Sequence, residues 1–333
     1  MNNMSSKKTV LVIVESPSKI KKIKSILEGL LDFKDKYNFI VKASYGHICD
    51  LDSKKLSIDI ENNFEPTYKV SESKTHVVSE LRRAKKNSDC VWIASDYDRE
   101  GESIAWHIHK SLKLNDQNSK RMIFTAITKE ALKNAVENMT TINLDMFKAQ
   151  QARRVIDRLI GYLISPVLWK QIQSSNKKDV SLSAGRIQSV VSKLIIDREN
   201  EIKKHNSMSS FKTNGVFKKE KKKINSELNK QFDNKNDVKL FLQECINSKF
   251  IVDEVTKKKS TRKPSAPFIT STLQQEASNR LKFSPKKTMS VAQSLYDNAY
   301  ITYMRTDCYT LSDEAIELGK AKIIELFGEK YYN

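Results

Sequence analysis

The fold of this 333-residue chain is decided by one stretch, Cys90-Val-Trp-Ile-Ala-Ser-Asp-Tyr-Asp-Arg-Glu-Gly-Glu-Ser-Ile-Ala-Trp106. Its first part, residues 90–95, is a short apolar run of the kind that forms a strand buried on both faces of a parallel sheet. An acidic turn follows at 96–103, and a helix is predicted over 104–112. The stretch therefore predicts a strand, a turn and a helix in succession.

A similar unit stands near the start of the chain. Residues 9–14 are apolar and rich in β-branched side chains, and residues 19–27 carry apolar side chains at helical spacing. Between them, Ser16 is expected to cap the helix, with Pro17 at the first helical position. A third unit is predicted from strand 121–125 into a helix near 129–139. Strands that alternate with helices predict a Rossmann-like α/β domain with a parallel sheet over about 10–140.

The remainder of the sequence is mainly helical. Helices are expected at 149–172, 185–204, 270–281, 285–297 and 312–326. Pro166 should kink or break the first of them, because proline removes a helical hydrogen bond. The region 205–262 is rich in Lys and Asn, and only weak strands at 211–217 and 249–255 are expected there.

The composition narrows the classes of function. Lys and Arg number 59 against 40 Asp and Glu, a formal net charge of +19. Such a balance indicates a polyanionic partner, or a genome whose composition favours lysine, and charge alone leaves both open. The four cysteines include no Cys-x-x-Cys pair, which argues against a zinc site or a disulfide framework. No apolar run is long enough to span a membrane, and no P-loop motif for ATP occurs. A cytoplasmic protein with reduced thiols is expected.

Three carboxylates follow the strand at 90–95, namely Asp96, Asp98 and Glu100. The carboxyl end of a parallel strand is where ligands bind in open α/β sheets, and alternate residues of an extended turn project to one side. Glu15 would stand at the end of the neighbouring strand and complete the group. Converging carboxylates need a shared cation, and Mg²⁺ prefers such oxygen ligands. The alternative is a solvated acidic turn that caps a helix.

Two basic residues and one tyrosine are candidates for phosphate chemistry. Lys19 lies one helical turn after Glu15 and could reach a phosphate at the helix start, unless it is an ordinary surface lysine. Tyr303 is followed by Arg305, whose guanidinium could stabilise a phenolate and hold a phosphate. The pattern Tyr-x-Arg is not specific by itself.

Two further patches could contact a nucleic-acid backbone. Arg154 and Arg158 lie one helical turn apart, with Asp157 between them, and could straddle successive phosphates. An ion-paired solvated helix face explains the same pattern. The segment 183–188 offers small residues and free amides at a helix start, which suits either phosphate binding or plain capping.

Together these motifs resemble one family, the type IA DNA topoisomerases, and within it the bacterial topoisomerase I group. The matching segments are Ile13-Val-Glu-Ser-Pro-Ser-Lys19, Ser44-Tyr-Gly-His47, Asp96 through Trp106, Gln151-Ala-Arg-Arg-Val-Ile-Asp-Arg158, Leu182-Ser-Ala-Gly-Arg-Ile-Gln-Ser189, Pro267-Phe-Ile-Thr-Ser-Thr-Leu-Gln-Gln275 and Tyr300-Ile-Thr-Tyr-Met-Arg-Thr-Asp307. They occur in family order across nearly the whole chain.

The resemblance implies an α/β Toprim domain followed by mainly helical topoisomerase core domains, the last ones incomplete. The implied domains are a Toprim domain at 8–144, with 51–66 as a possible excursion into the helical domain, a helical DNA-binding domain at 145–204, a β-rich partial arch at 205–265, and the start of a tyrosine-bearing helical domain at 266–333. Because family members continue further, a fragment or a truncated gene product is expected.

The resemblance also implies roles for individual residues. Tyr303 would attack single-stranded DNA, and Glu15, Lys19 and Arg305 would share the catalytic centre. Glu15, Asp96, Asp98 and Glu100 would bind Mg²⁺. The implied DNA contacts are His47, Arg153, Arg154, Val155, Asp157, Arg158, Leu163, Lys170, Ser183, Ala184, Gly185, Arg186, Ile187, Gln188 and Arg305.

The expected activity is the ATP-independent relaxation of negative supercoils by a monomer in the cytoplasm, at the bacterial nucleoid, with DNA as the partner. Two alternatives stay open. One is a Toprim nuclease or primase that uses the acidic residues without a tyrosine intermediate. The other is a truncated remnant that binds single-stranded DNA without full activity.

Overall fold

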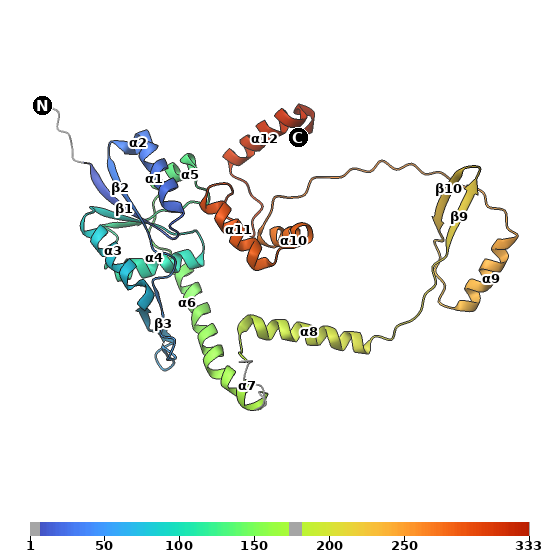
Figure 1. Cartoon of the computed structure of the whole chain (residues 1–333), viewed down its shortest axis with the longest axis horizontal. Coiled ribbons are helices and arrows are strands. Elements are labelled where there is room, and N and C mark those ends of the chain that lie inside the picture. Colours follow the sequence, from blue (N-terminus) through green and yellow to red (C-terminus); the bar gives the residue numbers. More distant parts are fainter. Residues whose placement is uncertain (1–6, 173–181, 333) are drawn as a thin grey trace. The chain divides into compact units, whose positions relative to one another are not determined.

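A parallel sheet of four strands organises the N-terminal part of the computed structural model, which describes residues 7–172 and 182–332 (Figure 1). In spatial order the strands are β2 (Tyr37–Ala43), β1 (Lys8–Val14), β7 (Cys90–Ala94) and β8 (Ser119–Arg121). All neighbours run parallel, with Val14 of β1 opposite Ala43 and Ala94. The predicted parallel α/β sheet is confirmed.

Both faces of the sheet are covered, as the apolar strands predict. On β1, Val10, Val12 and Val14 belong to one core, whereas Leu11 and Ile13 belong to the other. The first core is shared with α1 (Lys19–Gly29) and α5 (Lys129–Glu137), and the second with α3 (Thr75–Lys86) and α4 (Arg99–Ser111). The sheet thus lies between two helical layers.

Several boundaries differ from the prediction. The helix expected at 104–112 is α4, which begins five residues earlier at Arg99, and the helix expected from 149 is α6 (Leu144–Leu159), which also begins five residues earlier. The N-cap of α1 is Ser18 rather than Ser16, because residues 16–20 first form a tight turn in which Lys19 N–H donates to the Ser16 carbonyl over 3.2 Å. The strand expected at 121–125 is β8, Ser119–Arg121. It stops at Arg121 because that residue pairs with Ile93, one residue before β7 ends.

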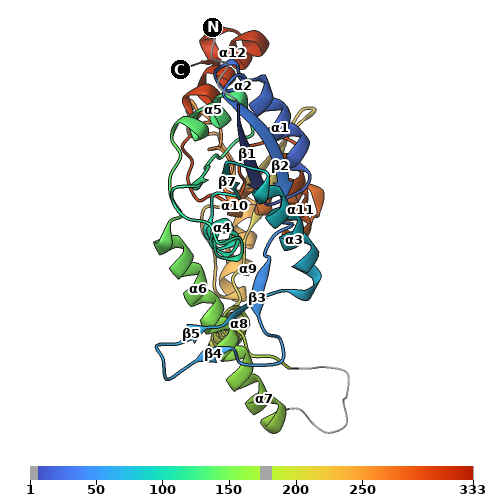
Figure 2. The same ribbon diagram turned by 90° about the vertical axis from the view of Figure 1, so that its left-hand side faces the viewer.

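Short strands extend from the sheet towards the next helix. They are β3 (Cys49–Leu51), β4 (Ile58–Asp59), β5 (Glu65–Pro66) and β6 (Tyr68–Val70), with a short helix α2 (Leu31–Lys34) before β2 and a 3-10 turn η1 (Glu72–Lys74) before α3. β3 pairs with β6 and β4 with β5. Figure 2 shows β4 and β5 beside α6 (Leu144–Leu159), and just after this helix the Tyr162 hydroxyl donates to the Lys54 carbonyl over 2.9 Å.

The long helix predicted at 149–172 is interrupted. α6 runs into a π-helical segment, η2 (Ile160–Ile164), before α7 (Ser165–Gln171) begins with Pro166 in its first turn. Proline tolerates the first turn of a helix but not its interior, so the backbone widens just before it. The disturbance expected at Pro166 takes the form of this π-helical segment, and the helical backbone continues through it into α7.

Residues 186–264 form a compact unit of their own. It holds α8 (Arg186–Lys204), β9 (Asn214–Lys219), β10 (Lys222–Glu227) and α9 (Lys235–Ile246). The strand expected at 211–217 is β9, but its partner is β10 through a turn at Glu220, whose φ is 53°. The strand expected at 249–255 is wrong, since that stretch is irregular.

The helix α9 was not anticipated. Its apolar residues Val238, Phe241 and Cys245 recur at helical spacing after the capping residue Asn234, whose side chain accepts from Asn236 N–H over 2.9 Å. This signal was present among the lysines and asparagines of the region.

The C-terminal residues belong to the same compact unit as the sheet, which comprises 1–185 and 265–333. Their elements are α10 (Thr270–Leu281), α11 (Pro285–Asp297), α12 (Asp313–Phe327) and a final turn η3 (Glu329–Tyr331). Ala292, Tyr296, Tyr303 and Met304 are buried in the core that contains the even-numbered valines of β1. None of the described helices is long and apolar enough to cross a membrane. The four-domain division stays a prediction, and its residues 173–181 and 333 lie outside the described ranges.

Candidate active site

Three of the predicted acidic residues stand at the carboxyl edge of the sheet. Glu15 follows β1, and Asp96 and Asp98 follow the neighbouring strand β7. Burial raises the pKa of the Glu15 carboxyl to about 7, the charge of Asp96 and then that of Asp98 add to the rise, and Lys19 opposes it. These three carboxyl groups therefore feel one another's charge, as the sequence predicts.

Glu100 does not face these carboxylates. The helix α4 begins at Arg99, and Asp98 is its N-cap, with its side chain accepting from Gly101 N–H over 2.7 Å. The extended turn therefore ends at Asp98, and Glu100 lies in the first helical turn. There its Oε2 is 2.8 Å from His47 Nε2 and accepts from Gln150 Nε2 over 3.3 Å. The expectation that alternate residues place all three carboxylates on one side is wrong at this third position.

The first turn of α4 packs so closely on the acidic turn that position 101 requires a glycine. A Cβ atom on Gly101 would lie 2.0 Å from the Asp96 carbonyl oxygen, a distance that no side chain tolerates. That backbone oxygen also accepts from Arg121 Nη2 over 3.0 Å, and Arg121 is fully buried in an ion pair with Glu102 at 3.0 Å. Glycine and the buried arginine together fix the peptide that carries Asp96.

Lys19 is not a surface lysine. Its side chain is 0% exposed, in an ion pair with Asp96 and with its Nζ 3.4 Å from Asp297 Oδ1. The Nζ also lies 4.6 Å from the ring centroid of Tyr296. A buried ammonium needs such partners, because desolvation of an unpaired charge is costly. Lys19 therefore joins α1, the acidic turn and α11 at one point.

Tyr303 lies against the acidic turn. Its backbone N–H donates to the Thr125 carbonyl over 2.8 Å, and its hydroxyl donates to Asp98 Oδ2 over 2.5 Å. Burial and the hydrogen bond to Asp98 raise the pKa of the phenol above its ordinary value, which Arg305 offsets only in part. Arg305 Nη1 is 3.3 Å from the same Asp98 oxygen. Tyrosine, arginine and carboxylate thus meet at one atom.

Sequence reasoning missed two side chains of this site, both on α11. Asp297 accepts from Ser18 Oγ over 2.7 Å and from Gln293 Nε2 over 3.0 Å. Gln293 Nε2 also lies 3.4 Å from Asp96 Oδ2. Their spacing of four residues puts both on one helical face, just before Tyr303. Polar residues on an otherwise apolar helix face were the available signal.

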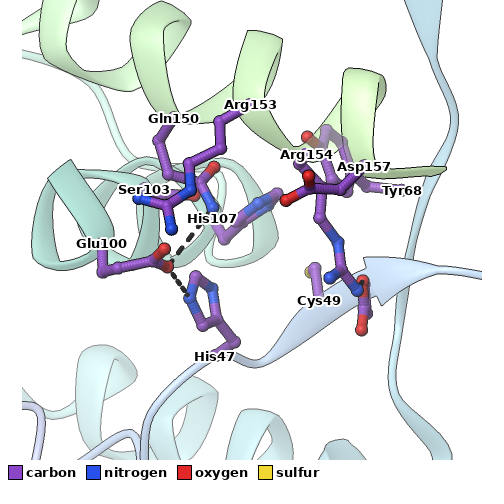
Figure 3. A pocket seen from close by; sticks show the side chains of 11 residues that line it. His47, Cys49, Tyr68, Glu100, Ser103, His107, Gln150, Arg153, Arg154 and Asp157 are labelled. Carbon is purple, nitrogen blue, oxygen red and sulfur yellow. Dashed lines mark hydrogen bonds and ion pairs between the residues drawn. The ribbon is translucent and has the colours of Figure 1, made fainter. Parts of the chain in front are cut away.

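Three of the predicted DNA-contact residues on α6 line a pocket of about 290 Å³ together with His47 (Figure 3). Arg153, Arg154 and Asp157 reach it from the helix, and Glu100 and His107 from α4. Arg154 is ion-paired with Asp50. This ion pair favours the alternative of a paired helix face over an arginine poised on open surface.

Arg158 serves the neighbouring loop. Its guanidinium donates to the carbonyls of Asp52 over 2.8 Å, Lys55 over 3.1 Å and Leu51 over 3.4 Å. It therefore fixes the loop after β3 against α6. To contact a DNA phosphate, Arg158 would have to give up its hydrogen bonds to these carbonyls.

The remaining predicted contacts are scattered. Val155 is buried, whereas Leu163 and Lys170 are exposed. Ser183, Ala184 and Gly185 precede α8, with Ala184 N–H donating to Ser165 Oγ over 3.0 Å, and Arg186, Ile187 and Gln188 form its first turn. The helix start at this motif agrees with the prediction within one residue.

In the part of the chain that the structure describes, no three His, Cys, Asp or Glu side chains are placed to hold a metal ion as they stand. The donor chemistry nevertheless fits a hard cation. Burial is the main cause of the raised pKa of Glu15, the charges of Asp96 and Asp98 add to it, and a cation at this place would offset all three effects. Glu15, Asp96 and Asp98 are the residues that fit.

Comparison with known proteins shows the family to which this chain belongs. Residues 10–127 match the Toprim domain model, and residues 141–333 match the model described as DNA topoisomerase. A curated relative, "DNA topoisomerase 1 type prokaryotic" of Acanthamoeba polyphaga mimivirus, is 44% identical over 97% of this chain and 39% of its own length.

A solved structure, full-length topoisomerase I from Thermotoga maritima, is 38% identical with a TM-score of 0.79, over 96% of this chain and 53% of that one. The chain therefore spans about half or less of the length of these relatives. Both family models, the sequence relative and the solved structure point the same way, and the chain belongs to the type IA DNA topoisomerase family.

Proposed function

We propose that this chain carries the cleavage centre of a type IA topoisomerase, which cuts single-stranded DNA through a 5′-phosphotyrosine link. The observation that carries the proposal is the Tyr303 hydroxyl, 2.5 Å from Asp98 Oδ2 and beside Arg305. A phenol is a weak nucleophile until its proton is taken, and Asp98 is the acceptor within hydrogen-bond reach.

The steps follow from the side chains. The Tyr303 oxygen forms a bond to phosphorus as its proton passes to Asp98. The bond from phosphorus to the DNA 3′-oxygen breaks, and the leaving oxygen takes a proton from water to become the 3′-hydroxyl. Arg305 and Lys19 stabilise the charge that develops on the phosphoryl oxygens. Reversal of the attack by the 3′-hydroxyl restores the strand, so no ATP is required. Passage of the intact strand before this reversal would relax negative supercoils.

Toprim domains bind metal ions, and we assign Mg²⁺ to Glu15, Asp96 and Asp98. When bound, Mg²⁺ would neutralise part of the carboxylate charge and polarise the phosphate. Glu100 joins this set only if its carboxylate leaves His47. The remaining assignments follow the family: DNA contacts by the predicted residues of α6 and α8, a monomer, and a cytoplasmic place at the nucleoid.

Covalent trapping tests the proposal. The chain is incubated with an end-labelled single-stranded oligonucleotide and Mg²⁺ and then denatured. We expect a labelled protein–DNA adduct from the wild type and none from Tyr303→Phe. The neighbouring Tyr300→Phe is the matched control, because the Tyr300 side chain is 78% exposed. Strand cuts without an adduct would establish the Toprim nuclease instead. Binding without cuts or adduct would establish a DNA-binding remnant.

A further inference from the structure

The turn Ser44–His47 is fixed beside the acidic edge by the backbone. It follows β2, the neighbour of β1 in the sheet. Ser44 N–H donates to the Val14 carbonyl over 2.9 Å, and Gly46 N–H donates to the Glu15 carbonyl over 3.2 Å. The backbone of this turn therefore has a defined place next to Glu15.

Tyr45 leaves the turn in an unfavourable backbone conformation. Its φ is 58°, in the left-handed region, where side chains with a Cβ are strained. Packing does not compensate the strain, because the residue is 52% exposed. Gly46, with φ 81°, adopts a similar conformation without this penalty. A strained residue that keeps a large exposed ring points to a use outside the fold.

A cation accompanies the exposed ring. Lys74, at the end of η1, donates from its Nζ to the Tyr45 carbonyl over 2.7 Å. The same Nζ lies 5.8 Å from the ring centroid. On the far side of the turn, His47 contacts Glu100. An aromatic face with an ammonium at its edge matches a nucleotide, which presents a flat base and an anionic phosphate.

We propose that Tyr45 is a stacking platform for one base of single-stranded DNA, with Lys74 positioned for an adjacent phosphate. The assignment rests on the proposed function, since the strand must pass the acidic edge to reach Tyr303. Stacking tolerates every base, because each has a π face. Tyr45 would therefore contribute affinity without strong sequence preference.

The test uses the left-handed backbone conformation of Tyr45. Tyr45→Gly removes the ring and gives the left-handed position the residue that adopts it freely. Affinity is measured by fluorescence anisotropy with a dye-labelled oligo-dT strand in the absence of Mg²⁺, so that no strand is cut. We expect Tyr45→Gly to weaken binding roughly 5- to 100-fold and Tyr45→Phe to bind like the wild type. The melting temperature of Tyr45→Gly should not fall.

Phe64 supplies a matched control. It is the other aromatic residue with positive φ in the described part of the chain, at 57°, and is 47% exposed. It lies just before β5, not at the acidic edge. Phe64→Gly should leave the affinity unchanged.

Three outcomes would overturn the assignment. They are unchanged affinity in Tyr45→Gly, equal loss in Phe64→Gly, and a fall in melting temperature that accounts for the lost binding. The affinity measurement does not depend on the chemistry of Tyr303. If the wild type forms no adduct while Tyr45→Gly still binds weakly, the cleavage proposal fails and the stacking platform stands.

Discussion

The two sides of the acidic turn, two residues apart in sequence, are opposite electrostatic environments. On one side, Asp98 meets Tyr303 and Arg305 beside the buried Lys19. On the other, Glu100 meets His47, and both side chains are about 40% exposed, at 43% and 39%. Burial raises the pKa of Glu15 on the first side, whereas the hydrogen bond from His47 lowers the pKa of Glu100 on the second.

The difference shows how one motif serves two sites. On the Tyr303 side three carboxylates share Lys19 and Arg305, and burial and crowding favour a proton or a cation there, whereas on the His47 side one half-exposed carboxylate has His47 to itself as a basic partner. The division is made by the start of α4, because Asp98 is its cap and Glu100 lies in its first turn. Three predictions sharpen or break this comparison.

The largest effect is expected from Asp98→Asn. Asparagine caps a helix about as well as aspartate, so α4 should keep its start. It cannot take the proton of Tyr303, and the loss of a positioned base costs roughly 10²- to 10⁴-fold in rate. The rate of adduct formation in a single-turnover cleavage assay measures this loss.

Glu100→Gln is the matched change on the other side of the turn. It removes the same charge but leaves the contacts of Tyr303 intact, and we expect a much smaller loss of rate. Equal losses in the two variants would break the comparison and return Glu100 to the metal-binding set.

The second prediction concerns His107, which is buried near the His47 side. Burial lowers its pKa to about 4 from an ordinary value near 6.5. The unfolded chain gains this proton as the pH falls below 6.5, whereas the folded chain does not until about pH 4. Acidification through this window therefore destabilises the fold, by up to about 3 kcal/mol.

Urea denaturation at about pH 7 and about pH 5 measures the effect. His107→Gln should be less stable in total but should lose less stability on acidification than the wild type. His76→Gln, at an exposed position on α3, should lose as much stability on acidification as the wild type. If His107→Gln lost as much stability on acidification as the wild type, His107 would not be the residue that causes this loss.

The smallest effect is expected from Arg154→Gln. Its ion pair with Asp50 is roughly half exposed, so the free energy of unfolding should change by less than about 1 kcal/mol. If the arginine exchanges Asp50 for a phosphate, the slope of log affinity against log salt for single-stranded DNA should fall by about 0.7. Arg154→Lys retains the charge and should retain the slope. An unchanged slope in Arg154→Gln would show that this arginine only links α6 to β3 and does not contact a DNA phosphate.

The parts of the fold that depend on local pattern were predictable. The strand expected at 9–14 is β1, and the helices expected at 185–204 and 285–297 agree within one residue. The start of α1 was not predicted correctly. Ser16 lies in the turn before the helix, and the N-cap Ser18 makes no side-chain capping hydrogen bond but donates to Asp297, 279 residues away. The strand β10 was missed because its six residues are exposed and include one apolar side chain, Ile224, so that no strand periodicity marks it.

The site divides in the same way. Glu15, Asp96 and Asp98 were predictable, since parallel strands end at one edge whatever the rest of the chain does. The roles of Glu100 and Arg154 depend on partners at 47 and 50, which no local pattern encodes. Gln293 and Asp297 enter the site only because α11 packs on the sheet, a contact far away in sequence.

The burial of Tyr303 and Tyr296 in the core of the sheet has a consequence for limited proteolysis. Residues 251–268 are irregular and exposed, which makes them a natural place for a protease to cut. A single nick there would divide the covalent chain but not the shared core, so the C-terminal peptide should co-elute with the N-terminal one. Tyr303 and the carboxylates of the acidic turn would then belong to two halves of a split protein.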